Sequence, residues 1–313
     1  MLSPVLKKAV KSGRDFLDLD QIDPVELKSI LQLAHKMKKA PLAFRPMEGK
    51  TLALIFEKPS TRTRVSFEVG MRQLGGHVTT LSGAEIQLGR GETIADTGKV
   101  LSRYTDIIML RTFASQKLYE LAQGATVPVI NGLTDASHPC QVMADIMTVE
   151  ERLGSLTGKT VVWSGDGGDN VLISWIHAAP IFDFTLKIIC PPEFVPPQDV
   201  LIEAQKKGAK VTIGADVKAA EGADVVITDC WVSMHNSDAA ARHERLSPYQ
   251  VDGEMMSKAS KHAIFLHCLP AHRGEEVTDD VLDGPQSAVF DEAENRMHIQ
   301  KAIMCWCMNI KGP

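Results

Sequence analysis

The fold class of this chain is decided by residues 51–81, which read TLALIFEKPSTRTRVSFEVGMRQLGGHVTTL. An apolar run at 51–56 is followed by a turn rich in Ser, Thr and Arg, by a helical pattern near 63–74, and by a second apolar run at 77–81. Short apolar runs of this kind are typical of buried strands, and two strands joined by a helix form a parallel βαβ unit. The stretch therefore predicts a parallel sheet.

The same alternation extends to both sides of this unit. Upstream, Asp23, Pro24 and Glu26 are typical of the first residues of a helix, which we expect to run to about Lys39. Downstream, the pattern predicts strands at 106–110 and 127–130, helices near 92–103 and 115–123, and a long helix at about 140–153.

The alternation begins again after Gly154 and Gly158. Five more candidate strands follow, at 160–164, 184–190, 209–213, 223–228 and 263–267. We therefore predict an α/β protein with two doubly wound parallel-sheet domains, residues 1–150 and 151–293, and a cleft between them. A last helix at about 294–310 could pack on either domain.

Composition excludes several classes of protein. Hydrophobic residues make up 44% and charged residues 23%, close to the globular average, which argues against a disordered chain and a collagen-like repeat. The 313 residues are enough for a buried core in each of two domains. Lys and Arg number 34 against 39 Asp and Glu, a net charge of −5, so we expect no nucleic acid partner.

Six cysteines occur in a chain that shows no secretory leader and no CxxC pair, so we expect reduced thiols in a cytoplasmic protein and no zinc or redox site. We also expect no other metal and no cofactor. These cysteines are Cys140, Cys190, Cys230, Cys268, Cys305 and Cys307. The first 14 residues carry four basic side chains and no acid, but the stretch is short and nearly free of Arg, which argues against an organelle presequence. No apolar run approaches the ~20 residues of a membrane span.

Unusual polar residues follow the predicted strands, where ligands bind in open α/β sheets. In the first half these residues are Ser60, Thr61, Arg62, Thr63, Arg64, Gln87, Arg111, His138 and Gln141. In the second half they are Asn170, Asp229, Ser233 and Cys268. We expect the two sets to face each other across the predicted cleft.

The turn from Ser60 to Arg64 offers backbone N–H groups, hydroxyls and the positive end of a helix dipole. The Arg62 guanidinium can donate two parallel hydrogen bonds to a phosphate. The turn therefore predicts an anion site that lacks the lysine of a Walker motif. Because Arg62 and Arg64 cannot face the same way on a helix, we assign Arg64 to structural pairing. A plain helix cap with solvated arginines is the alternative.

Single polar residues at the other strand ends allow two interpretations each. His138 precedes Pro139 and could bind a small polar ligand together with Gln141, or simply cap a helix. A carboxylate after an apolar run, as at Asp229, either forms an ion pair within the protein or binds a cation. Cys268, which follows His267, could be a nucleophile or a small buried residue, and no third group that would complete a Cys-His catalytic set is identifiable.

The loop from Gly165 to Asn170 follows a strand and invites a dinucleotide-binding interpretation. Asp166 and Asp169 would repel a pyrophosphate, and no acidic residue occurs near the ribose-binding position until Glu193. We therefore do not expect a nicotinamide enzyme.

Taken together, five sequence motifs resemble the ornithine carbamoyltransferases, above all bacterial anabolic members, of the aspartate/ornithine carbamoyltransferase family. The motifs are 56–64, 138–141, 229–234, 267–270 and 294–296. They occur in the family's order and spacing along nearly the whole chain. The resemblance implies transfer of a carbamoyl group from carbamoyl phosphate to L-ornithine in arginine biosynthesis, by a homotrimer with shared active sites.

The resemblance also implies a role for each matching residue. Carbamoyl phosphate would contact Ser60, Thr61, Arg62, Thr63, Arg111, His138, Gln141, Cys268, Leu269, Arg296 and, from a neighbouring subunit, Gln87. L-Ornithine would contact Asn170, Asp229, Ser233 and Met234. Among these, Arg111, His138, Thr63 and Cys268 would act in catalysis, and Leu269-Pro270 is typically a cis bond in the family.

Two departures from the family pattern lie on the amino-acid side. Residues 235–237 replace a common Gly-Gln-Glu, and the loop 165–170 is one residue longer than usual. Two alternatives therefore stay open: a transcarbamoylase for another amine, such as N-acetylornithine or putrescine, and a non-catalytic carbamoyl phosphate binder.

Overall fold

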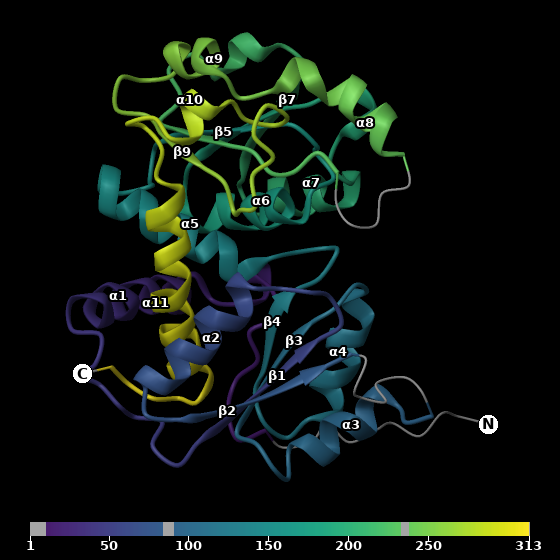
Figure 1. Ribbon diagram of the computed structural model, residues 1–313, viewed down its shortest axis with the longest axis vertical. Helices are drawn as coiled ribbons and strands as arrows, with labels where there is room; N and C mark the ends of the chain where they lie inside the picture. The colour runs from purple at the N-terminus through teal and green to yellow at the C-terminus, as the bar shows by residue number, and fades with distance from the viewer. Residues whose placement is uncertain (1–10, 84–90, 233–237, 313) are drawn as a thin grey trace. The chain divides into compact units, whose positions relative to one another are not determined.

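A computed structural model describes residues 11–83, 91–232 and 238–312 of the chain (Figure 1). The chain divides into two compact units. The first comprises the residues up to Cys140 and those from Met297 onward, and the second comprises Gln141–Arg296. Each unit contains one parallel sheet, which confirms the predicted α/β class with two doubly wound parallel-sheet domains.

The first unit is built on a four-stranded sheet with the strand order β2-β1-β3-β4. Its strands are β1 (Thr51–Phe56), β2 (His77–Ser82), β3 (Ile107–Arg111) and β4 (Val129–Leu133), and its helices are α1 (Pro24–Lys39), α2 (Arg62–Gln73), α3 (Ile94–Leu101) and α4 (Ser115–Gly124). A short 3-10 helix, η1 (Leu19–Gln21), precedes α1. The central strands β1 and β3 are buried along nearly their whole length, as expected for a parallel sheet covered on both faces.

Alternate side chains of β1 show how this sheet is covered. Ala53 and Ile55 pack in one core cluster with Leu118 and Leu121 of α4. This period of two is the strand period, while the two leucines lie three residues apart on one face of a helix. The predicted strands and helices of the first half are all present, with ends that differ by a few residues.

The second unit is built on a five-stranded sheet with the order β7-β6-β5-β8-β9. The strands are β5 (Thr160–Ser164), β6 (Thr185–Ile189), β7 (Lys210–Gly214), β8 (Val225–Ile227) and β9 (Ile264–Leu266). The helices are α6 (Asn170–Phe182), α7 (Gln198–Lys206), α8 (Ala239–Leu246), α9 (Gly253–Lys258) and α10 (Asp279–Leu282), with 3-10 helices η2 (Pro192–Phe194), η3 (Val217–Ala220) and η4 (Ser247–Tyr249).

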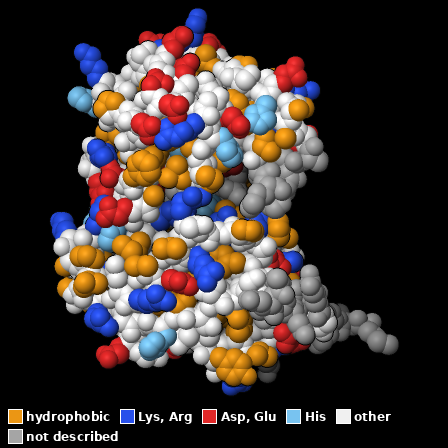
Figure 2. Space-filling view, viewed as in Figure 1, with side chains coloured by type: hydrophobic (Ala, Val, Ile, Leu, Met, Phe, Trp, Pro, Cys, Tyr) orange, Lys and Arg blue, Asp and Glu red, His pale blue; other side chains and the backbone are white. Residues whose placement is uncertain are grey.

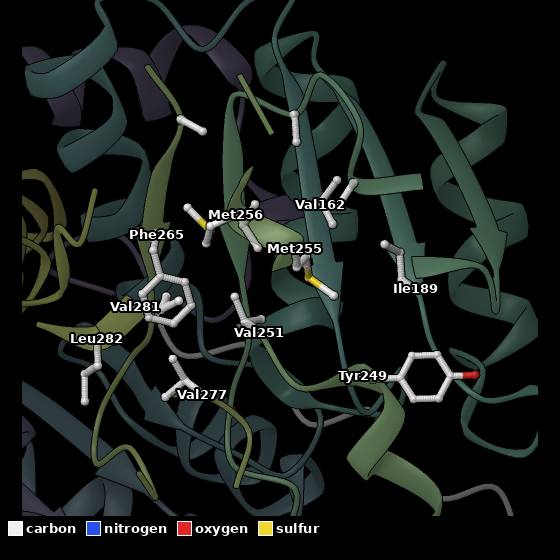
Figure 3. Close-up of a cluster of buried hydrophobic side chains, with 14 of the residues drawn as sticks. Val162, Ile189, Tyr249, Val251, Met255, Met256, Phe265, Val277, Val281 and Leu282 are labelled. Atoms are coloured by element: carbon white, nitrogen blue, oxygen red, sulfur yellow. The ribbon is translucent and has the colours of Figure 1, made fainter. Parts of the chain in front are cut away.

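One core cluster of the second unit joins its sheet to α9. Figure 3 shows Met255 and Met256 of α9 among side chains that include Val162 of β5 and Phe265 of β9. All four are 5% exposed or less, so α9 covers this part of the sheet. Burial of such side chains is the main source of stability for the unit.

Two long helices, α5 (Pro139–Leu153) and α11 (Val289–Cys307), contain the limits of the units. The last helix begins at Val289 rather than at about 294, so its predicted start was wrong. Asp291 and Glu292 fall in its first turn, where negative charge favours a helix N-terminus. From Met297 onward α11 belongs to the first unit, where Lys301 donates hydrogen bonds to Gln73 Oε1 at 2.8 Å and Pro41 O at 2.7 Å.

The six cysteines are distributed over both units. All six cysteines are free thiols. Among the described residues, no helix is both long and apolar enough to cross a membrane. On the face that Figure 2 displays, acidic and basic side chains are interspersed on each unit.

Candidate active site

The strand order places the polar residues of the first unit at a topological switch point. The chain turns to opposite sides after β1 and β3, which are neighbours, and ligands of open α/β sheets bind outside the carboxyl ends of such strands. Arg111 is the last residue of β3 and pairs in register with Phe56, the last residue of β1. Ser60 and Thr61 follow β1 after three intervening residues, so both groups lie at one edge.

A hydrogen bond joins the two strand ends. Arg111 Nη1 donates to Thr63 Oγ1 over 3.3 Å, and Thr63 is 1% exposed in the first turn of α2. The hydroxyl thereby aims a guanidinium toward the N-terminal end of α2. Thr61, the N-cap residue, makes no side-chain capping hydrogen bond, so its hydroxyl is not used as an ordinary cap.

The two arginines of α2 behave differently. Arg64 Nε lies 3.5 Å from Glu68 Oε1 one turn along the helix, which confirms the predicted structural pairing. Arg62 forms no salt bridge within the described residues. The Arg62 guanidinium at the start of α2 is therefore available to bind an anion.

Charged residues that the sequence analysis did not assign hold the chain after β1. Glu57 accepts a hydrogen bond from Lys117 at 2.7 Å and another from the Thr112 hydroxyl. Lys58, 5% exposed, pairs with Asp135 and lies 4.5 Å over the Phe113 ring. Two opposite charges directly after a buried strand are the sequence signal that could have drawn attention to them.

His138 lies at the end of the loop between β4 and α5 and is 3% exposed. That loop is closed by a hydrogen bond from Thr134 N to Ser137 O at 3.0 Å and another from Ser137 N to Thr134 Oγ1 at 3.2 Å. The following Pro139 is the first residue of α5, one residue before the predicted start at about Cys140. The histidine is therefore held on a rigid turn beyond a strand end.

In the second unit the switch point lies between β5 and β8. The loop after β5 is constrained by its glycines, since Gly165 has φ +133° and a Cβ on Gly167 would lie 2.2 Å from Phe194 O. Asp166 accepts a hydrogen bond from Gly168 N at 2.8 Å and pairs with Arg242. These contacts fasten the loop to the rest of its own unit.

Two carboxylates meet beyond these strands. Asp169 caps α6 by accepting a hydrogen bond from Val171 N at 2.7 Å, and Asn170 begins the helix. Desolvation, together with the charges of Asp229 and Asp166, raises the pKa of Asp169 well above its ordinary value.

Asp229 follows β8 and accepts a hydrogen bond from Cys230 N at 2.7 Å. Within residues 11–83, 91–232 and 238–312, no lysine or arginine pairs with Asp229 or Asp169. This edge of the sheet therefore has an excess of negative charge that a bound cation would relieve.

The end of β9 carries the motif from His267 to Pro270. The Leu269–Pro270 bond is cis, as expected from the resemblance, and Leu269 has φ +59°. Leu269 N donates to His267 Nδ1 at 2.9 Å, so the ring proton is on Nε2, which lies 3.0 Å from Glu276 Oε1. Burial would raise the pKa of Glu276, but its hydrogen bonds from His267 and from His272 N lower it overall.

The sulfur chemistry at this edge argues against covalent catalysis. Cys268 Sγ lies 3.7 Å from Leu269 O, and desolvation, followed by the charge of Asp229, raises the pKa of its thiol well above the usual value. Cys230 Sγ donates to Pro270 O at 3.0 Å, and desolvation likewise raises its pKa. Both sulfurs are therefore neutral thiols near pH 7 and poor nucleophiles.

Asp229, Cys230 and His267 place ligand-type atoms within 4.8 Å of one another. A metal would need a thiolate and a free ring nitrogen, whereas this thiol is neutral and His267 Nδ1 already accepts a hydrogen bond. An organic ammonium group suits these residues better, because the carboxylate can accept its hydrogen bonds directly.

The remaining predicted residues are distributed as follows. Gln141 and Arg296 lie in the second unit, near two buried acids, Asp145 and Glu292, that the sequence analysis did not single out. The spacing of Gln141 and Asp145, four residues apart on one helix, is the signal that could have linked them. Gln87, Ser233 and Met234 lie outside the described residues.

Models of one family match both units. The aspartate/ornithine carbamoyltransferase carbamoyl-P binding domain matches residues 14–151, and the Asp/Orn binding domain of the same family matches residues 157–307. The chain therefore belongs to the aspartate/ornithine carbamoyltransferase family, and the resemblance drawn from its motifs is confirmed.

The individual proteins that are similar to this chain share one enzyme name within the family. A protein of Rhodopseudomonas palustris named ornithine carbamoyltransferase is 57% identical over 308 residues, which are 96% of this chain and 98% of that protein. The solved structure of ornithine carbamoyltransferase from Pyrococcus furiosus is 46% identical, with a TM-score of 0.91 over 98% of this chain and all of that one. An anabolic ornithine carbamoyltransferase from Campylobacter jejuni is 36% identical, with a TM-score of 0.89 over 95% of this chain and 99% of that chain.

Proposed function

We propose that this protein is an ornithine carbamoyltransferase, which transfers the carbamoyl group of carbamoyl phosphate to the side-chain amine of L-ornithine and releases L-citrulline and phosphate. The observation that carries the proposal is the contact of Arg111 with Thr63 beside the uncapped start of α2, at the switch point of a parallel sheet. The relatives at 57% identity with nearly full coverage support the same activity.

Carbamoyl phosphate binds to the first unit in this proposal. The phosphate is held by Ser60, Thr61, Arg62 and the backbone N–H groups of α2, all of which favour an anion. Arg111, Thr63 and His138 converge on the carbonyl oxygen, where negative charge grows as the amine attacks. Preorganised donors at such an oxygen are usually the largest source of rate enhancement in acyl transfer.

Ornithine binds to the second unit. Asp229 holds its α-ammonium group, at the acidic edge that also contains Asp169, while Asn170, Ser233 and Met234 contact the rest of the amino acid. Cys268 and the Leu269 carbonyl orient the attacking amine. No covalent intermediate is needed, and the departing phosphate can accept the proton that the amine loses.

Assembly, location and pathway are also part of the proposal. We place the enzyme in arginine biosynthesis in the cytoplasm, as a homotrimer in which Gln87 reaches the carbamoyl phosphate of a neighbouring subunit. Measurement of the solution mass by light scattering, with a Gln87→Ala variant assayed beside the parent, tests the shared site.

The test of the activity is an assay of citrulline formation from carbamoyl phosphate and L-ornithine by the full chain. N-Acetylornithine and putrescine serve as parallel acceptors, since the first has an uncharged α-amide in place of the α-ammonium group and the second lacks the α-carboxylate. Efficient turnover of ornithine alone supports the proposal. Preference for either other amine, or phosphate binding without transfer to any amine, would overturn it.

The pH dependence of turnover follows from the acceptor amine. The side-chain amine of ornithine resembles that of lysine, with a solution pKa of about 10.4, and only its neutral form can attack. We expect kcat/KM for ornithine to climb from pH 6 toward pH 8, initially by about tenfold per pH unit. Carbamoyl phosphate affinity measured over the same range is the control, and a flat kcat/KM profile contradicts this mechanism.

The Cys268→Ser variant tests the assignment of orientation rather than nucleophilic attack. Because the thiol is neutral, the hydroxyl that replaces it keeps a donor at the same place. We expect KM for ornithine to rise by roughly three- to tenfold, with measurable turnover retained. Complete loss of activity together with a trapped carbamoyl-enzyme, detected by mass spectrometry in the parent protein, would show that the sulfur is the nucleophile.

A further inference from the structure

Two carboxyl groups lie together in the interior of the second unit. Asp145 of α5 and Glu292 of α11 are each 1% exposed, and their side chains are hydrogen-bonded to each other. Two carboxylates cannot form such a bond unless a proton lies between them. Burial raises the pKa of Asp145 to about 7 and that of Glu292 well above its usual value, against the opposing charge of Arg296. The pair therefore holds a proton near neutral pH.

The amide of Gln141 is fastened to this pair. Gln141 Nε2 donates to Asp145 Oδ1 at 2.7 Å and to Glu292 Oε1 at 2.7 Å, which uses both of its hydrogens. An amide oxygen at the same position would face two carboxyl oxygens and be repelled. The pair thus determines which end of the Gln141 amide is nitrogen and which is oxygen.

Two further hydrogen bonds hold the carboxyl groups of Asp145 and Glu292 at the oxygens that do not contact Gln141. Trp175 Nε1 donates to Asp145 Oδ2 at 3.1 Å, and His267 N donates to Glu292 Oε2 at 2.9 Å. All four carboxyl oxygens therefore have partners, and rotation of either carboxyl group would break hydrogen bonds in a buried place. The orientation of Gln141 is built into the fold of this unit.

The other end of the amide is unused. Gln141 Oε1 is buried, and no donor reaches it within the described part of the chain. A buried amide oxygen without a partner is costly, and an orphaned acceptor of this kind indicates that a ligand supplies the missing N–H.

We propose that Asp145 and Glu292 are positioning residues that fix the Gln141 amide so that Oε1 accepts a hydrogen bond from the NH₂ of the carbamoyl group. This inference rests on the proposed function, because it needs carbamoyl phosphate as the ligand. It adds a selective element: phosphate alone, and acyl phosphates without an N–H, cannot make this bond. The bond also fixes the plane of the carbamoyl group, and with it the direction of the carbonyl oxygen.

Acetyl phosphate is the probe that isolates this bond, since it has the same phosphate and carbonyl but a methyl group in place of NH₂. The experiment measures Kd for carbamoyl phosphate and for acetyl phosphate with the full-length protein, by calorimetry. We expect the parent protein to prefer carbamoyl phosphate. The ratio of the two constants reports on the N–H acceptor, whereas general damage to the site weakens both ligands.

Asp145→Asn places an NH₂ donor where Gln141 Nε2 now donates, so the Gln141 amide turns over and presents its own NH₂ to the ligand. We expect Kd for carbamoyl phosphate to rise about tenfold and Kd for acetyl phosphate to stay within about twofold. Glu292→Gln alters the second acceptor of the Gln141 amide, and we expect the same changes in the two Kd values. This variant provides the test if Asp145→Asn does not fold.

Thr148→Val is the matched control. Thr148 lies on the same helix as Asp145, is fully buried, and accepts a hydrogen bond from Asn295 of α11 at 2.9 Å without touching Gln141. We expect this variant to keep the parent's ratio of affinities. In the double variant with Gln141→Leu, Asp145→Asn should cause no further loss of carbamoyl phosphate affinity, because the acceptor that it positions is gone.

An unchanged ratio in both Asp145→Asn and Glu292→Gln would overturn the inference, as would an equal loss of affinity for the two ligands. An additive loss in the double variant would overturn it as well. Failure of the proposed function is distinguishable, because the parent protein itself would then form no citrulline and show no preference for carbamoyl phosphate.

Discussion

Arg111→Ala is expected to lower kcat for citrulline formation by about 10²- to 10³-fold, the range found when one donor to a developing oxyanion is removed. Arg111 ends β3 at the switch point, and its Nη1 is held 3.3 Å from Thr63 Oγ1. A guanidinium fixed in this way stabilises charge that appears only as the amine attacks. The loss should therefore fall on kcat more than on KM for ornithine.

Arg64→Ala provides the control for loss of a positive charge nearby. Its partner Glu68 lies one helical turn away, and the Arg64 side chain is 56% exposed, so the pair contributes little to stability. We expect kcat to stay within about twofold of the parent. Turnover of Arg111→Ala near the parent rate, with thermal stability unchanged, would remove Arg111 from the active site.

The alternation of apolar runs and helical patterns was enough to predict two parallel sheets, because a parallel strand buried on both faces needs a continuous apolar sequence. It was also enough to place Arg111 and Asp229 at strand ends. The order of the strands was not predictable in this way. That β1 adjoins β3, and β5 adjoins β8, follows from packing of helices on the two faces of each sheet, which no local pattern encodes.

The residues that the sequence analysis missed depend on contacts between distant segments. Glu292 reaches Gln141 across 151 residues of sequence, and Lys117 reaches Glu57 across 60. Each looks like an ordinary charged helix residue when taken alone. The early start of α11 was missed for a related reason: Val289 is fully buried by the surrounding core, so its place in a helix is set by tertiary packing.

The acidic edge of the second unit gives the other large expected effect. Asp229→Asn keeps the shape of the side chain and the hydrogen bond from Cys230 N, but removes the charge that we assign to the α-ammonium of ornithine. Removal of one partner of a desolvated ion pair typically costs several kcal/mol, so we expect kcat/KM for ornithine to fall by about 10²- to 10³-fold. Carbamoyl phosphate affinity should not change.

N-Acetylornithine makes this prediction specific to the α-ammonium group. It carries the same attacking amine and α-carboxylate as ornithine, but its α-nitrogen is an uncharged amide, so its weak use should be affected far less by Asp229→Asn. The preference for ornithine over N-acetylornithine should therefore narrow in the variant. Loss of use of both amines in equal proportion would instead place Asp229 at the attacking nitrogen.

Asp252→Asn is the matched control for this substitution. Asp252 caps α9 in the same unit by accepting a hydrogen bond from Met255 N at 2.8 Å, and asparagine caps helices about as well as aspartate. The control removes one negative charge from the unit without touching the acidic edge, and we expect kinetics within about twofold of the parent. If Asp229→Asn behaved like this control, the ammonium of the acceptor would have to be bound elsewhere, and selection for ornithine would not reside in the carboxylate beyond β8.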